Sequence, residues 1–163
     1  MPQSPAPKGM SFLLVEDFTH LAFSCAIEPL RIANLLSGQE LYRWRLISAN
    51  GTDARCSNGT ITLVDQGMEP LPRGEAMFVL SGNHVDRHIT PALLNYIRRE
   101  RARGTRIGAL CSGALVLAHA GLLEGERAAI HWQFHDAFEE AFSGIDLCRS
   151  VFVADSRHPT ASG

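Results

Sequence analysis

The segment from residue 106 to residue 120 constrains the fold more than any other part of this chain. An apolar run, Arg-Ile-Gly-Ala-Leu, leads into Cys111, and a second apolar run follows at 114–120. Small residues, Ala109 and Gly113, stand on either side of the cysteine. The pattern predicts a strand, a tight turn and a helix, an arrangement called a nucleophile elbow, which holds one side chain at the carboxyl edge of a sheet. A helix N-terminus directly after the sulfur favours thiolate over thiol.

The rest of the chain alternates between strand patterns and helix patterns. Continuous apolar runs and one alternating run predict strands at 10–15, 42–47, 76–80, 106–110, 128–130 and 151–154. Apolar residues at helical spacing predict helices at 21–36, 91–103, 114–120 and 133–142. Strands and helices that alternate at these lengths predict an α/β fold, with a doubly wound, mostly parallel sheet and helices on both faces.

The length and the apolar content predict a single domain. With 163 residues, of which 45% are hydrophobic and 20% charged, the chain is long enough to bury a core of its own. We expect the Pro-rich residues 1–9 to be a disordered leader and residues 10–163 to form the domain. Residues 160–163 have the sequence of a loop that enters a helix, and no helix follows. We therefore expect the domain to be incomplete at its C-terminal end.

Charge and hydropathy bear on location and partners. No apolar run reaches the length needed to span a membrane, and the Pro-rich start lacks the apolar core of a signal peptide. We therefore expect a cytoplasmic protein without a membrane partner. The net charge of −2 argues against broad capture of nucleic acid by this chain alone. The arginine-rich run at 98–103 is instead typical of a solvated helix end, where cations complement the helix dipole.

The cysteine and histidine spacings do not indicate a metal site. The four cysteines, at positions 25, 56, 111 and 148, are far apart and form no C-x-x-C pair, which fits neither a zinc finger nor a disulfide framework. Two histidine pairs have i, i+4 spacing, His84 with His88 and His131 with His135. Neither pair has an adjacent glutamate or a third ligand nearby. We expect no metal and no cofactor.

Cys111 needs neighbours if it is to act chemically. His131 follows the strand predicted at 128–130 and is the best candidate for a base or hydrogen-bond partner. The backbone N–H groups of Ser112 and Gly82 could form an anion-binding nest beside the sulfur. Each residue also has an ordinary structural interpretation: a lone cysteine is usually a core residue, and a lone histidine is usually satisfied within the fold.

Longer sequence strings resemble a known family. The string at 108–125, followed by Ala-Ala-Ile-His-Trp at 128–132, resembles the GlxA family of AraC-type transcriptional regulators. The N-terminal part is similar to the same family at 12–15, 21–23 and 26–34. Within the family, the chain resembles the branch that governs the use of glycine betaine, carnitine or arginine-type nitrogen compounds.

This resemblance implies a ThiJ/PfpI-like sensor domain with the fold of the class I glutamine amidotransferases, a flavodoxin-like sandwich. In the family an AraC-type helix-turn-helix domain follows, and it is absent from this chain. Residues 155–163 resemble the last strand of the sensor domain and the start of its final helix. The resemblance thus implies a homodimer that binds a small-molecule effector, and contact with DNA only through the missing domain.

The resemblance also bears on catalysis. Enzymes of the wider ThiJ/PfpI superfamily pair the elbow cysteine with an acidic side chain from the first helix region. That acidic position falls on Ala22 here, and the nearest acid, Glu28, lies almost two helical turns further along. Because alanine can neither hold nor take a proton, the superfamily's pair of cysteine and acid is broken in this chain.

Three functional hypotheses follow. The first is an effector sensor whose pocket is lined by Gly82, Cys111, Ser112, His131 and Trp132, with Trp132 as a cation–π face for a quaternary ammonium. The second is a Cys-dependent hydrolase, hydratase or glyoxalase-like enzyme, with Cys111 and His131 as its catalytic residues. The third is a dimerisation module with a vestigial pocket. The broken pair of cysteine and acid favours sensing over turnover.

Overall fold

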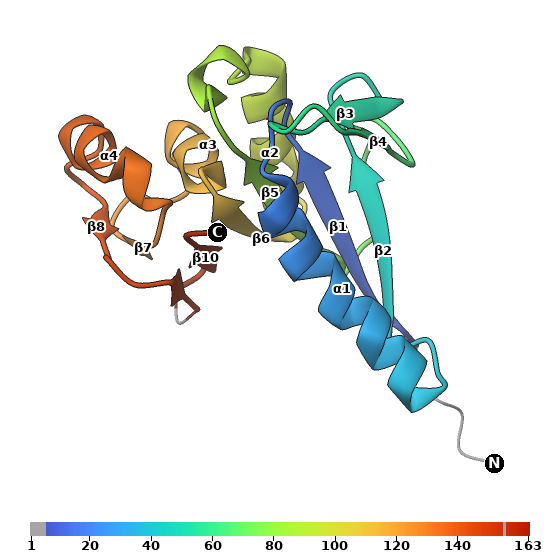
Figure 1. The fold of residues 1–163 in the computed structure, drawn as a ribbon. Helices are drawn as coiled ribbons and strands as arrows, with labels where there is room; N and C mark the ends of the chain where they lie inside the picture. Colours follow the sequence, from blue (N-terminus) through green and yellow to red (C-terminus); the bar gives the residue numbers. More distant parts are fainter. Residues whose placement is uncertain (1–5, 155) are drawn as a thin grey trace.

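The computed structural model describes residues 6–154 and 156–163, which are built around a six-stranded sheet in the order β2-β1-β5-β6-β10-β9 (Figure 1). Its strands are β1 Lys8–Leu14, β2 Tyr42–Ile47, β5 Ala76–Ser81, β6 Arg106–Cys111, β9 Phe152–Val153 and β10 Thr160–Ala161. Every neighbouring pair is parallel except β9 with β10. The predicted doubly wound, mostly parallel sheet is confirmed.

Helices cover both faces of this sheet, as predicted. Helix α1 (His20–Ser37) packs on one face, and α2 (Pro91–Ala102) and α3 (Gly113–His119) pack on the other (Figure 1). Because side chains alternate along a strand, Phe12 of β1 joins the core beneath α1, while its neighbour Leu13 joins the core beneath α2 and α3. Strand β5 alternates between the two cores in the same way.

Local signals set the ends of the two longer helices. Thr90 precedes α2 and its hydroxyl accepts a hydrogen bond from the Leu93 N–H, while Pro91 occupies the first turn, where its missing N–H costs nothing. Helix α1 ends at Gly38, which has a left-handed backbone with φ of 65°. The Asn58-Gly59 turn joins two short strands, β3 (Asp53–Arg55) and β4 (Ile61–Leu63), in a hairpin.

The region after α3 differs from the prediction. It contains β7 Arg127–Ala128, a 3-10 helix η2 Trp132–Phe134, α4 His135–Ala141 and β8 Asp146–Leu147. The strand predicted at 128–130 does not join the central sheet: β7 is short, and among the described residues it pairs only with β8. One reason is that the N–H of Ala129 donates to the side-chain Oγ1 of Thr160 at 2.8 Å and not to the backbone of a neighbouring strand. The helix predicted at 133–142 is divided into η2 and the shorter α4.

At both ends of the chain the structure differs in detail from the predicted elements. Thr160 pairs with Ala109 of β6 on one side and Val153 of β9 on the other, so Thr160–Ala161 form strand β10 where the local sequence had suggested a loop. The predicted leader, 1–9, is too long. Its first five residues lie outside the described part of the chain, but Lys8 already belongs to β1, where its N–H donates to the Leu41 carbonyl. Within residues 6–154 and 156–163, no helix combines the length and apolar character required to cross a bilayer.

His158 makes the stability of this fold depend on pH. Burial lowers the pKa of its imidazole, whose Nδ1 lies 2.8 Å from the Ile107 carbonyl oxygen. The unfolded chain, with a histidine pKa of about 6.5, therefore binds a proton more readily than the folded one. The contribution of His158 is complete above about pH 6.5 and is lost as the pH falls towards the lower folded pKa. We expect urea titrations to show a loss of at most about 1.4 kcal/mol per pH unit from this group. His158→Gln should flatten that slope, and equal slopes would contradict the assignment.

Candidate functional site

The carboxyl ends of the strands form the edge of the sheet at which a ligand site is expected, because the strand order changes direction at β1. Strand β1 has β2 on one side and β5 on the other, so the loops after β1 and β5 diverge at this point, where ligands bind in open α/β sheets. Among the described residues, three non-glycine positions have positive φ: Asp17 at 63°, His84 at 57° and Cys111 at 58°. They lie at or just after the ends of β1, β5 and β6. Because such conformations cost energy and concentrate at functional sites, this edge is the candidate site.

Cys111 has a polar neighbour that the sequence did not reveal. Its Sγ is buried and lies 3.3 Å from Oγ1 of Thr19, and either atom can donate. Thr19 is the N-cap residue of α1 by its backbone angles, yet its side chain makes no capping hydrogen bond. A capping hydroxyl commonly stabilises a helix by about 1 kcal/mol. Here the hydroxyl contacts the sulfur, so the helix forgoes that stabilisation in favour of the site.

Ala22, which the resemblance aligns with the superfamily's acid, is buried in the first turn of α1. No carboxylate among the described residues hydrogen-bonds to Cys111. Thr19 supplies a hydroxyl, which can orient the sulfur and donate to a thiolate but is not a base near neutral pH. The site therefore holds its cysteine in a defined geometry without an acidic partner.

Gly82 and Ser112 act as structural supports next to the sulfur. The buried Ser112 hydroxyl donates to the Gly82 carbonyl oxygen at 2.7 Å and lies 2.8 Å from the hydroxyl oxygen of Ser81. Gly82 pairs with Phe18 in an antiparallel bridge. Because it packs so closely, a side chain on Gly82 would meet the Asp17 carbonyl and lie 2.9 Å from the backbone nitrogen of Thr19. The structure places both predicted residues at the site, with the Ser112 side chain engaged in internal hydrogen bonds.

His131 lies on the other side of the cysteine. Its backbone N–H donates to the Cys111 carbonyl at 3.3 Å. A side-chain carbon built on Gly163 would lie 3.6 Å from Cys111 Sγ and 3.7 Å from His131 Cδ2, so both side chains line the space around Gly163. The imidazole Nδ1 accepts from the Gln133 N–H at 3.4 Å. Trp132 is 73% exposed, and its ring centroid lies 5.5 Å from that of His131. The predicted residues thus form one group, with Trp132 at its outer rim.

Sequence reasoning missed the contributions of the loop after β1. Besides Thr19, this loop supplies Asp17, whose Oδ2 lies 3.0 Å from His88 Nε2. A cavity of about 160 Å³ opens beside this pair, between the ends of β1 and the start of α2. The sequence did hold a signal for this loop, the run Glu-Asp-Phe-Thr at 16–19 between a predicted strand and a predicted helix. Loops at the carboxyl ends of neighbouring parallel strands meet, so polar residues in this loop could have been expected near Cys111.

The two histidine pairs lie in different surroundings. His84 and His88 flank a 3-10 helix, η1 (Val85–Arg87), and His88 faces Asp17. His135 Nε2 lies 3.1 Å from the Ile130 carbonyl oxygen, and η2 separates it from His131. Over residues 6–154 and 156–163, no three His, Cys, Asp or Glu side chains gather in an arrangement that could hold a metal ion.

The fold and the elbow cysteine define a family. The model of the DJ-1/PfpI family matches residues 10–163, and the chain belongs to that family. A crystal structure of an AraC family transcriptional regulator from Pseudomonas putida has the same fold, with a TM-score of 0.81 at 22% identity, covering 96% of this chain and 84% of that one.

Relatives with assigned names give more specific information than the family model does. The chain is 39% identical over 152 residues to the HTH-type transcriptional regulator CdhR of Pseudomonas aeruginosa, covering 93% of this chain and 45% of that protein. It is 36% identical over 155 residues to the HTH-type transcriptional regulator GlxA of Rhizobium meliloti, covering 94% of this chain and 48% of that protein. The chain therefore spans about half the length of these relatives. The predicted resemblance to regulators of this type is confirmed.

Proposed function

We propose that this chain is the effector-binding domain of a transcriptional regulator and that its effector, a small nitrogenous metabolite, binds over Cys111. The observation that carries the proposal is the convergence of Cys111, Thr19 and His131 at the switch point of the sheet, in a chain similar to proteins named as HTH-type regulators. DNA would be contacted by a separate domain, as befits relatives about twice as long. We place this activity in the cytoplasm.

The side chains at this edge suit a ligand of the betaine, carnitine or arginine type. Since Nδ1 of His131 accepts from the Gln133 N–H, the neutral ring carries its proton on Nε2, which is then a donor for a carboxylate. The exposed face of Trp132 offers a cation–π surface for a quaternary ammonium or guanidinium group. A zwitterionic ligand would meet both groups, because the two rings are adjacent.

Calorimetric titration with glycine betaine, carnitine and arginine tests this proposal. We expect one of them to bind, and Trp132→Ala to weaken its binding by roughly 3- to 30-fold, the range of an exposed to a desolvated cation–π contact. Trp132→Phe should retain part of the affinity, because a phenyl ring keeps a π face. Phe152→Ala removes another exposed aromatic ring, on β9, and serves as the control. No heat from any of the three ligands would exclude this ligand class.

A Cys-dependent enzyme is the second candidate function. It is favoured by the strained elbow position of Cys111 and its contact with the Thr19 hydroxyl. Such an enzyme would have alanine, and no acid, at position 22, so His131 would have to act as the base. Turnover of methylglyoxal or an isocyanide that disappears in Cys111→Ala would replace the sensor proposal with this one. Absence of both turnover and ligand binding would leave a dimerisation module with a vestigial pocket.

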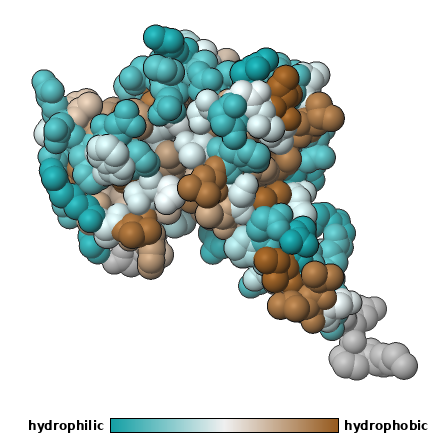
Figure 2. Space-filling model, viewed as in Figure 1, coloured by the Kyte–Doolittle hydropathy of each residue, from teal (hydrophilic) through white to brown (hydrophobic). Residues whose placement is uncertain are grey.

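The outer face of α1 supports association of two copies. Leu21, Ile32, Leu35 and Leu36 are exposed along one side of this helix. Figure 2 shows hydrophobic surface gathered over the C-terminal end of α1. A helix that is apolar on both its inner and outer faces is typical of a buried element, and a symmetric dimer would bury the same stripe on each copy. Sedimentation velocity distinguishes this dimer from a monomer.

A further inference from the structure

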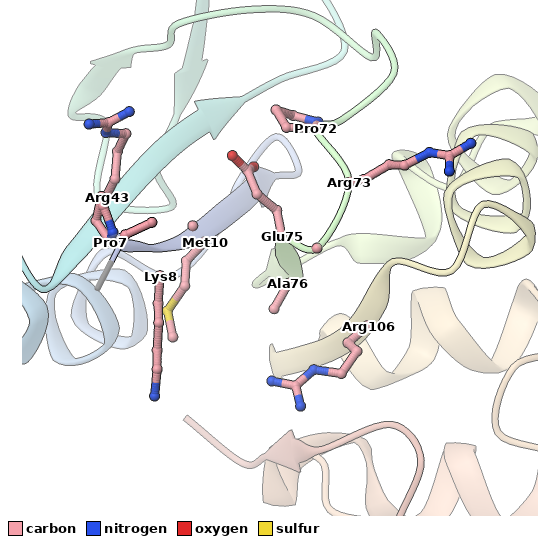
Figure 3. A pocket seen from close by; sticks show the side chains of 12 residues that line it. Pro7, Lys8, Met10, Arg43, Pro72, Arg73, Glu75, Ala76 and Arg106 are labelled. Carbon is pink, nitrogen blue, oxygen red and sulfur yellow. The ribbon is translucent and has the colours of Figure 1, made fainter. Parts of the chain in front are cut away.

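A second pocket lies at the amino edge of the sheet, at the opposite ends of the strands from Cys111. It is a cavity of about 460 Å³ where β1, β5 and β6 begin, at Lys8, Ala76 and Arg106 (Figure 3). Its volume falls within the range of small-molecule sites, roughly 300–1,000 Å³. Neither the similar proteins named above nor the proposed effector site assigns a role to this cavity.

Its mouth carries positive charge without a counter-ion. Lys8, Arg73 and Arg106 line it, and within residues 6–154 and 156–163 none of their three side chains makes a hydrogen bond or an ion pair. Figure 3 shows the Lys8 and Arg106 side chains extending into the same region, below Met10 and Ala76. Two cations that line one cavity without a protein counter-ion attract an anion into it.

The carboxylate in the pocket does not neutralise these cations. Glu75 points away from Lys8 and Arg106 in Figure 3 and is mostly buried in the wall. Its Oε2 accepts from the Ser11 hydroxyl at 2.8 Å, and its Oε1 lies 3.6 Å from Arg45 Nη2. The charge of Glu75 is thus matched within the wall, and the mouth remains positive.

We propose that this cavity binds a small organic anion through a carboxylate or phosphate group held between Lys8 and Arg106. A guanidinium group binds the oxygens of either group in a bidentate manner, and a lysine ammonium adds a compact second charge. Met10, Pro72 and Ala76 provide apolar surface for the carbon skeleton. A concave site favours a small molecule over duplex DNA, and the net charge of −2 opposes a polyanion.

Citrate and inorganic phosphate are suitable probes for this site. We expect saturable citrate binding by calorimetry with one site per chain, weakened at least about tenfold in the double variant Lys8→Gln/Arg106→Gln. Arg149→Gln, which removes an exposed arginine near α4, is the matched control and should bind citrate as the wild type does. Lys8 is the only lysine of the sequence, so citrate should also protect a single ε-amine from acylation, read by peptide mapping.

Three results would overturn the proposal. The first is absence of citrate and phosphate binding. The second is equal citrate binding by the wild type and the double variant, together with an acylation rate of Lys8 in the wild type that citrate does not change. The third is protection of Lys8 in the wild type by a short DNA duplex but by neither small anion. Thermal unfolding of the double variant establishes that it is folded. The same variant is also titrated with glycine betaine, carnitine and arginine. Their binding at the proposed effector site, at the other edge of the sheet, should be unchanged, which distinguishes failure of one proposal from failure of the other.

Discussion

Replacing Gly113 with alanine is expected to destabilise the domain by about 2–3 kcal/mol, although alanine is the better helix former. Gly113 is the first residue of α3, and a Cβ there would overlap the carbonyl oxygen of Val79 in β5 and lie 3.3 Å from the Ala109 side chain. The change from glycine to alanine in a helix is worth about 1 kcal/mol in the opposite direction. The clash prevails because backbone atoms of a central strand cannot move aside as a flexible side chain can.

Urea unfolding measures this difference, with Gly67→Ala as the matched control. A Cβ on Gly67 would have its nearest neighbour at 3.5 Å, an ordinary van der Waals contact, and the backbone there needs no positive φ. The control should change the free energy of unfolding by less than about 0.5 kcal/mol. A Gly113→Ala variant as stable as the wild type would show that α3 can move away from β5 at little cost.

The elbow could be predicted from the sequence because its signals are local. The apolar run at 106–110, the small residues around Cys111 and the apolar helix after it lie within fifteen consecutive residues and point to one structure. The long helices were predicted for the same reason, from apolar residues at helical spacing over 21–36 and 91–103.

The last part of the fold depends on distant contacts and was not predictable in this way. Thr160 becomes a strand residue because Ala109 and Val153 flank it, and its hydroxyl then takes the N–H of Ala129. None of these partners is near Thr160 in the sequence except Val153. Short segments such as β7 and β10 carry too few residues to show a period, so tertiary pairing decides their conformation.

The residues of the candidate site also fall into those with a local sequence signal and those placed only by distant contacts. Cys111 was found from its own surroundings, and the predicted Gly82, Ser112 and His131 do gather around it. Thr19 was missed because its role comes from a cysteine 92 positions away, and in the sequence it resembles an ordinary helix cap. The cations of the amino-edge pocket were missed similarly, because Lys8 and Arg106 line one cavity only when β1 and β6 are placed on either side of β5.

Gly82→Ala is expected to open the site around Cys111, raising the rate at which iodoacetamide alkylates this cysteine by at least about tenfold. A Cβ at position 82 would meet the Asp17 carbonyl and lie 2.9 Å from both the backbone nitrogen and the hydroxyl of Thr19. The loop after β1 must therefore shift, and the Thr19 hydroxyl moves with it away from the sulfur. Overpacking of this kind should also cost about 1–3 kcal/mol of stability.

Two cysteines of the same chain serve as internal references for this measurement. Cys25 is exposed and should react equally fast in every variant. Cys56 is buried, and desolvation raises the pKa of its thiol, so it should react slowly as long as the protein is folded. Peptide mapping after timed alkylation separates these sites. A rise at Cys111 alone reports a change confined to the site. Because Cys56 pairs with Phe18 of the same loop, a rise at both cysteines reports displacement of the whole loop or global unfolding, and urea unfolding of the variant distinguishes the two.

Thr19→Val separates the position of the loop from the hydrogen bond to the sulfur. Valine has nearly the shape of threonine, so the loop should stay in place while the contact between hydroxyl and sulfur is lost. We expect a smaller rise in Cys111 alkylation than in Gly82→Ala, because burial by the loop persists, and a loss of about 1 kcal/mol or less in stability, since the hydroxyl makes no capping bond that α1 would lose. If Gly82→Ala leaves the Cys111 rate at the wild-type value, the loop after β1 does not control access to the sulfur. An effector over Cys111 would then have to enter from the side of His131 and Trp132.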